Sequence, residues 1–256
     1  MSVEAHGGSP GIIDDPDPLH ILGLLRGGTM TLVGLLNWSS NYTFLGEVTL
    51  HGARAPVVYK PTRGERPLWD FQRGTLAKRE TAAFIISHAL GWGLVPPTVL
   101  RDGPHGPGSV QLFLDVDQEA HYFTFRDEPA FRRSLQALAL FDIVTNNADR
   151  KGGHCLRAAD GRVIAIDQGL CFHVEPKLRT VIWEFAGESV PDDLATDLAR
   201  LEVDLSDRHC QTVKELKRLL APTEIQALRR RLSRLIKAGA FPDPPEDRRP
   251  YPWPPV

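Results

Sequence analysis

At 256 residues the chain is long enough for one large domain or two lobes. Its 30 Lys and Arg residues nearly balance 32 Asp and Glu residues, and the net charge of -2 excludes a global field that would bind DNA, RNA or an anionic membrane. Three cysteines favour a reducing cytoplasm over a disulfide framework, and no run approaches the roughly 18 apolar residues of a membrane span, so we expect a cytoplasmic protein.

The first part of the chain predicts two helices and three strands. Residues 1–18 are rich in Gly, Pro and Asp and predict a flexible leader. A short helix is predicted from Leu19 to Arg26, because Leu recurs at helical spacing and two glycines then end the pattern. Further elements are predicted from β-branched and apolar runs: strands at Thr29 to Leu36, Phe44 to Leu50 and Ala55 to Pro61, and a helix from Glu80 to Leu90.

The middle of the chain predicts two strands and a long helix. The strands are Thr98 to Leu100 and Ser109 to Asp115, around a Gly- and Pro-rich turn. A crossing segment from Phe123 to Pro129 leads to a helix from Phe131 to Val144. The inner stripe of this helix is expected to hold Leu135, Leu138, Phe141 or Asp142, and Thr145.

A polar loop between two apolar elements is the most distinctive stretch. Asn147-Ala148-Asp149-Arg150 follows the predicted helix, and Asp167-Gln168-Gly169 follows an apolar strand. The turn at Ala159-Asp160-Gly161 predicts a β-hairpin between them. The hairpin would bring the acids Asp149 and Asp167 together. This arrangement suits phosphoryl transfer, since one carboxylate can receive the acceptor's proton while the other holds a metal ion.

These two motifs resemble the N-T-D-R and D-x-G elements of phosphatidylinositol 4-kinases and HipA-type kinases, and the whole chain is similar to an actinobacterial family of phosphatidylinositol 3-/4-kinase-like proteins. The resemblance implies an α+β, two-lobed protein-kinase-like fold with a small β-rich N-lobe and a larger helical C-lobe. Residues 19–117 would form the N-lobe and residues 118–240 the C-lobe. A Pro-rich tail, residues 241–256, would follow.

The resemblance assigns nucleotide binding first to the predicted strand that ends near Lys60. This Lys would hold the α- and β-phosphates of ATP, and Glu80 would pair with it. The alternative for Lys60 is a strand-end Lys that reaches water. The alternative for Glu80 is an acid favoured in a first helical turn by the helix dipole.

Two further segments would complete the nucleotide site. The loop between the first two strands lacks the kinase G-x-G-x-x-G pattern, so it would either cover the phosphates through backbone N–H groups and hydroxyls or be a plain hairpin turn. Its candidates are Ser39, Ser40 and Asn41. The strand that leads to the C-lobe would line the adenine pocket, and it also suits a core strand. Its candidates are Leu112 and Leu114.

The polar loop and hairpin would carry catalysis and metal binding. Asp149 is the expected general base, or the residue that orients the acceptor hydroxyl. Asn147 would organise the loop, and Arg150 would pair with a carboxylate or phosphate or lie on the surface. Asp167 would bind Mg²⁺ or Mn²⁺. His154 stands where the lipid-kinase pattern has an Asn as second metal ligand, which implies a softer ion, metal binding mostly by Asp167, or lost activity.

A zinc site is an alternative use of the same hairpin. Its four candidate ligands lie at the two ends of the hairpin: His154, Cys155, Cys171 and His173. The set lacks the usual C-x₂-C pairing, so buried free cysteines are preferred.

The remainder predicts helices and a tail. Helices are expected at Leu194 to Arg200 and Cys210 to Leu220, and a capping-box pattern at Thr223 opens a last helix. The outer face of that helix would be basic and either solvated or docked on an anionic partner, through Arg229, Arg230, Arg231, Arg234 and Lys237. The tail from Phe241 would lie on the surface or bind a partner.

The sequence therefore predicts an ATP-dependent phosphotransferase that moves the γ-phosphate to a hydroxyl of a protein, a small molecule or a lipid. The alternatives are a nucleotide-binding pseudokinase that acts as a regulatory or interaction module, and an enzyme that transfers AMP.

Overall fold

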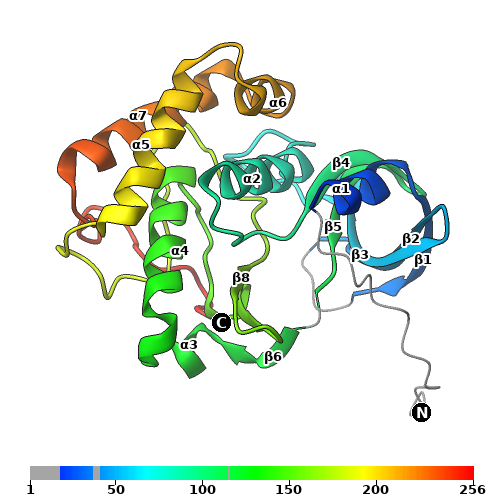
Figure 1. Cartoon of the computed structure of the whole chain (residues 1–256), viewed down its shortest axis with the longest axis horizontal. Helices are drawn as coiled ribbons and strands as arrows, with labels where there is room; N and C mark the ends of the chain where they lie inside the picture. The colour runs from blue at the N-terminus through cyan, green and yellow to red at the C-terminus, as the bar shows by residue number, and fades with distance from the viewer. Residues whose placement is uncertain (1–17, 37–40, 115) are drawn as a thin grey trace.

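The computed structural model describes residues 18–36, 41–114 and 116–256. Its first part is an antiparallel sheet of five strands in the order β1-β2-β3-β5-β4. These are β1 (Thr29–Leu35), β2 (Phe44–Leu50), β3 (Ala53–Pro61), β4 (Thr98–Gly103) and β5 (Gly106–Leu112). Helix α1 (Pro18–Gly27) packs on this sheet, and α2 (Leu76–Leu90) lies between the sheet and the helical part of the molecule (Figure 1).

Alternation along β3 decides which way Lys60 points. Ala55, Val57 and Tyr59 are buried and contribute to the core, and the residues between them are more exposed. Because successive side chains of a strand point to opposite faces, Lys60 faces away from this core. The strand predicted to carry a Lys near its end is therefore confirmed. The Lys60 side chain lies on the face of the sheet where it contacts Glu80 of α2 and Asp167.

A second, three-stranded sheet joins the two parts of the chain. It consists of β6 (Val116–His121), β7 (Cys155–Ala158) and β8 (Val163–Ala165), with β7 in the middle. The hairpin predicted around Ala159-Asp160-Gly161 is β7 and β8. Strand β6 was not predicted as a separate element, because the pattern extended the preceding strand to Asp115, whereas β5 ends at Leu112.

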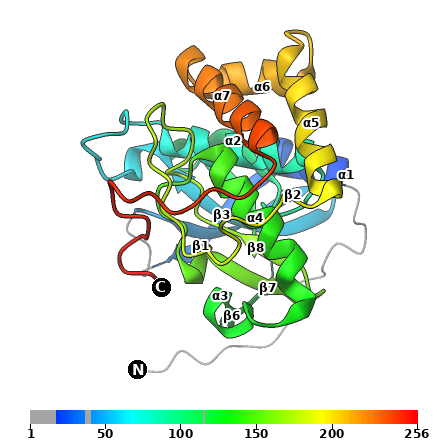
Figure 2. The ribbon, with the colours of Figure 1, turned by 90° about the vertical axis from the view of Figure 1, so that its left-hand side faces the viewer.

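Helices make up the rest of the fold. They are α3 (Tyr122–Phe125), α4 (Arg132–Thr145), α5 (Asp192–Ser206), α6 (Gln211–Leu219) and α7 (Pro222–Ala238), with short 3₁₀ turns η1 (Thr62–Gly64), η2 (Pro129–Phe131) and η3 (Gly152–His154). Figure 2 shows α5, α6 and α7 at one end of the molecule and β6 and β7 at the other, with α4 between them. Within the described ranges, no helix combines the length and apolar character needed to cross a bilayer.

Several details of the predicted helices are wrong. Helix α5 runs from Asp192 to Ser206, well beyond the predicted Leu194 to Arg200. Helix α2 begins at Leu76, so Glu80 lies in its second turn and not at its start. Helix α7 begins at Pro222, and Glu224 Oε2 accepts the N–H of Ala221, so the cap precedes the predicted Thr223. Arg231 is half-buried and donates to the carbonyls of two other segments, so it does not belong to the solvated basic face.

Candidate active site

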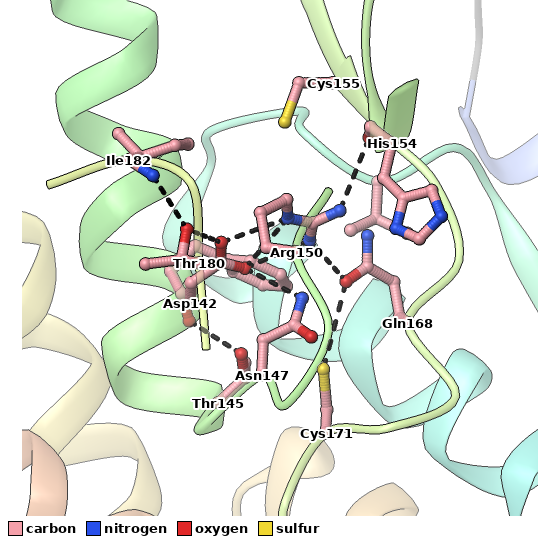
Figure 3. Close-up of polar contacts among 12 residues, drawn as sticks. Asp142, Thr145, Asn147, Arg150, His154, Cys155, Gln168, Cys171, Thr180 and Ile182 are labelled. Carbon is pink, nitrogen blue, oxygen red and sulfur yellow. Dashed lines mark hydrogen bonds and ion pairs between the residues drawn. The ribbon is translucent and has the colours of Figure 1, made fainter. Parts of the chain in front are cut away.

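A buried Arg holds the polar loop of residues 146–154, here called the Asp149 loop. The side chain of Arg150 is 0% exposed, as is that of its partner Asp142 on α4. Arg150 Nε lies 3.0 Å from Asp142 Oδ2, and Arg150 Nη2 lies 3.0 Å from Asp142 Oδ1 (Figure 3). Of the two positions considered for Arg150, the surface one is therefore wrong, and the guanidinium acts behind the loop.

Arg150 also reaches both sides of Asp167. Its Nη1 donates to the carbonyl of Ile166 at 2.9 Å, and its Nη2 donates to Oε1 of Gln168 at 2.7 Å. Only a planar guanidinium offers this many donors in a fixed fork. The two acid-bearing segments are thus tied to one side chain.

Asn147 fixes the loop to α4 through its side-chain amide. Its Nδ2 donates to Asp142 Oδ1 and its Oδ1 accepts the backbone N–H of Asp149, each at 3.0 Å. Thr180 completes the cluster, since its Oγ1 donates to Asp142 Oδ2 at 3.3 Å. Every Asp142 oxygen is therefore occupied by donors that locate the loop, as Figure 3 shows.

Asn146 is a site residue that the sequence analysis missed. It ends α4 in the left-handed conformation, with φ of 55°. Its side chain spans to the loop after the hairpin, residues 169–190: Nδ2 donates to the carbonyls of His173 and Glu175, and Oδ1 accepts the N–H of Lys177. Asn tolerates this backbone conformation better than most residues, so an Asn closing an apolar helix was the available signal.

Lys60, Glu80 and Asp167 come together as an ion-paired cluster. Lys60 Nζ lies 2.5 Å from Glu80 Oε1 and 3.0 Å from Asp167 Oδ1. Burial lowers the pKa of Lys60, but the carboxylates of Asp167 and Glu80 outweigh it and raise that pKa above its usual value. The Lys60 ammonium in turn holds the pKa of Asp167 well below its usual range. Glu80 Oε2 also accepts the N–H of Gln168, which fixes the pair to the hairpin.

Asp149 and His154 lie beside this cluster. His154 Nδ1 is 3.0 Å from the carbonyl of Asp149, and His154 Nε2 is 3.5 Å from Asp167 Oδ2. Burial raises the pKa of Asp149 to about 6, with Lys151 opposing the rise. Burial lowers the pKa of His154 to about 4, so its ring is neutral at pH 7. Asp167 has φ of 60°, in the left-handed region, which residues other than Gly, Asn and Asp seldom adopt and which recurs at functional sites.

One cavity of about 200 Å³ is lined by five of the predicted residues, of which four are ionisable: Lys60, Glu80, Asp149 and Asp167. Asn41 lines the same cavity, and its Oδ1 accepts the N–H of Arg66 at 2.8 Å. The other predicted phosphate-loop residues, Ser39 and Ser40, lie outside the described residues. Leu112 and Leu114 do not line this cavity, and their adenine role stays a prediction.

The four-residue zinc alternative is wrong for the described chain, where no group of three or more His, Cys, Asp or Glu residues is arranged to hold a metal ion. The Cys155 thiol faces the carbonyl of Lys151, and His173 Nε2 lies 2.9 Å from the carbonyl of Asp70. Cys155 and Cys171 are buried free thiols, as preferred.

The fold matches solved kinases at low sequence identity. The crystal structure of the Golgi casein kinase with Mn/ADP bound aligns with a TM-score of 0.50 and 16% identity, over 86% of this chain and 74% of that chain. The Helicobacter pylori proinflammatory kinase CtkA aligns with a TM-score of 0.50 and 11% identity, over 85% of this chain and 94% of that chain. These likenesses confirm the expected kinase-like α+β fold.

Two sequence relatives have higher identity to this chain than these solved kinases have. Protein Rv2133c of Mycobacterium tuberculosis is 39% identical over 264 aligned residues, covering 90% of this chain and 94% of the relative. Phosphatidylinositol 4-kinase gamma 4 of Oryza sativa subsp. japonica is 30% identical over 153 residues, covering 51% of this chain and 27% of the relative. The family model described as phosphatidylinositol 3- and 4-kinase matches residues 74–220, which include Asp149 and Asp167. The chain therefore belongs to the phosphatidylinositol 3- and 4-kinase family.

Proposed function

We propose that the protein is an ATP-dependent phosphotransferase that moves the γ-phosphate of ATP to a hydroxyl acceptor. One observation carries the proposal: Lys60, Glu80, Asp149 and Asp167, from four separate segments, line one cavity. Phosphoryl transfer needs a positively charged side chain that binds the phosphates and a carboxylate that holds this side chain in place. It also needs two further acids, one for the acceptor and one for a metal ion.

Each residue has a chemical task in this proposal. Lys60 binds phosphate oxygens, and Glu80 keeps its ammonium in place. Asp149 accepts the acceptor's proton or orients its hydroxyl. Its pKa of about 6 leaves it mostly ionised at pH 7 while making it more basic than an exposed Asp.

The donor set fits a divalent cation at Asp167 and His154. His154 Nδ1 lies 3.0 Å from the carbonyl of Asp149, which can only accept, and 3.5 Å from the N–H of Lys151. The shorter contact favours the proton on Nδ1, which leaves a lone pair on Nε2. That lone pair faces Asp167 Oδ2 at 3.5 Å, and two acceptors in this position favour a cation between them. The ion would be Mg²⁺ or Mn²⁺, with the imidazole favouring Mn²⁺, and it would neutralise phosphate charge. The Golgi casein kinase structure described above contains Mn and ADP.

The proposal names a class of acceptor and not a single substrate. It is a hydroxyl of a protein, a small molecule or an inositol lipid, and the family description and the rice relative's name favour testing the lipid first. The cytoplasmic location expected from the sparse cysteines stays a prediction.

Thermal unfolding with ATP, alone and with Mg²⁺ or Mn²⁺, tests the nucleotide site. Ligand at 100 times its dissociation constant should add about 2.7 kcal/mol to the unfolding free energy. Asp167→Asn should lose the metal-dependent part of this gain. Asp160→Asn is the matched control, since Asp160 sits exposed in the turn of the same hairpin and should keep the gain. Absence of any shift in the wild type would refute the nucleotide site.

Radiolabelled ATP then separates the alternatives. Transfer of label from the γ position, lost in Asp149→Ala without loss of ATP binding, supports the proposal. ATP binding without turnover would instead indicate a pseudokinase. Label transferred only from the α position would indicate AMP transfer.

A further inference from the structure

The C-terminal tail does not merely lie on the surface. The carbonyl of Pro255 accepts the N–H of Gly152, in the Asp149 loop, at 2.7 Å. The carbonyl of Pro250 accepts the N–H of Thr180 at 3.0 Å and the indole N–H of Trp183 at 3.2 Å. Figure 2 shows this last segment of the chain running back across the molecule from the end of α7.

The segment at Thr180 is itself paired with the Asp149 loop. The N–H of Arg150 donates to the carbonyl of Arg179, and the N–H of Val181 donates to the carbonyl of Arg150, at 3.0 and 3.1 Å. The N–H of Arg179 donates to the carbonyl of Asn147 at 2.9 Å. Residues 179–181 thus bond to the loop on one side and to the tail, through the Thr180 N–H, on the other. The tail reaches the loop both directly and through residues 179–181.

The chemistry of the tail suits it to this contact. Four of residues 250–256 are prolines, which have no N–H, so the segment offers mainly acceptors to the loop amides. A Pro-rich segment is stiff, because each ring fixes φ, and it therefore loses little conformational entropy when it docks. Pro252 is buried, whereas Tyr251, Trp253 and Val256 are exposed. The described contacts are therefore directed hydrogen bonds more than apolar burial.

We propose that residues 250–256 are a positioning strap for Asp149. The proposal rests on the phosphotransferase function above. Gly152 lies three residues after Asp149, and Thr180 donates to the same Asp142 that holds Arg150. Within the described part of the chain, the strap makes no hydrogen bond or ion pair with Lys60, Glu80 or Asp167. Losing it should therefore slow transfer and leave nucleotide affinity nearly unchanged. A misplacement of about 1 Å can cost on the order of 100-fold in rate.

The test compares the full chain with a chain that ends at Arg249. In the shortened chain, amide hydrogen exchange should become faster in peptides that contain Gly152 and Thr180. The kcat for transfer should fall about 10- to 100-fold, while the ATP-induced thermal shift stays. Asp247→Ala is the control, since Asp247 is exposed and its ion pair is with the neighbouring Arg248. Unchanged exchange at both amides would overturn the strap.

The exchange measurement does not depend on the proposed function. If the full chain transfers no phosphate, the function fails, and exchange still decides whether the tail holds the loop. If the shortened chain does not fold, Trp183→Phe in the full chain replaces it. This variant keeps an aromatic ring but removes one donor to Pro250, so exchange at Thr180 should be faster, and no change would overturn the proposal. Adding a peptide of residues 250–256 to the folded short chain should restore protection.

Discussion

Replacing Asp142 by Asn tests whether the buried ion pair holds the Asp149 loop. The change keeps the size of the side chain and removes its charge. Asp142 accepts hydrogen bonds from Arg150, Asn147 and Thr180. An Asn amide nitrogen in that position would place donor against donor, and it would leave the Arg150 guanidinium buried without a carboxylate.

The magnitude follows from the burial of both partners, whose side chains are 0% exposed. Breaking a buried pair by removing one partner costs about 3–5 kcal/mol, since the remaining charge is uncompensated. Each kcal/mol lowers the Tm of a chain of this size by roughly 2–4 °C. Asp142→Asn should therefore lower the Tm by about 6–20 °C. The loss of about 3–5 kcal/mol is a large part of a typical unfolding free energy of about 5–15 kcal/mol.

Urea and thermal unfolding, followed by circular dichroism, measure the effect. Asp193→Asn is the matched control, because Asp193 makes the same kind of pair with Arg133 at the surface, and its side chain is 74% exposed. That variant should change stability by less than about 1 kcal/mol. Equal effects of the two substitutions, or a loss below about 1 kcal/mol for Asp142→Asn, would refute the reasoning.

Two further predictions concern the same region. The chain has three cysteines: Cys155, Cys171 and Cys210. The first two are buried, and burial raises the pKa of each thiol to about 12, so iodoacetamide should label only the third in the folded protein, with no new labelling between pH 7.5 and 9. Peptide mass spectrometry measures this, and labelling of a buried thiol before unfolding would contradict it. Gly152→Ala should cost about 1–3 kcal/mol, because its Cβ would lie 2.5 Å from the Phe123 ring, whereas Gly153→Ala meets nothing within 4 Å and should cost less in the same urea titration.

Local patterns were sufficient for most of the fold but not for its long-range contacts. Alternation and helical spacing predicted the strand of Lys60 and helix α4, because both signals are carried by neighbouring residues. The resemblance named five residues that do line one cavity, Asn41 among them. The spacing could not decide whether Phe141 or Asp142 faced inward, since both positions fall near the stripe, and both are buried.

The contacts of the tail and of Asn146 could not be predicted from the sequence for a related reason. Their partners are backbone N–H and C=O groups. Nearly every residue carries both groups, and only proline lacks the N–H, so the sequence holds no residue type that predicts such a contact. A Pro-rich segment predicts an extended conformation whether the tail is docked or free. The docked tail instead bends at Tyr251, Trp253 and Pro254. Only the three-dimensional arrangement shows that Pro255 meets Gly152.

The arrangement also explains why the residue after Asp149 is Arg and predicts that Lys cannot replace it. Arg150 follows one acid directly, and its fork bonds the residues on both sides of the other, Ile166 and Gln168, so one side chain sets the distance between Asp149 and Asp167. Arg150→Lys keeps the charge toward Asp142 but has a single ammonium, so at least two buried acceptors lose a donor at about 1–3 kcal/mol each. In the folded fraction, the metal-dependent thermal shift with ATP should shrink, because both acids are less well placed. A Lys variant with wild-type stability and an unchanged shift would mean that the hairpin, and not the guanidinium, fixes the two acids.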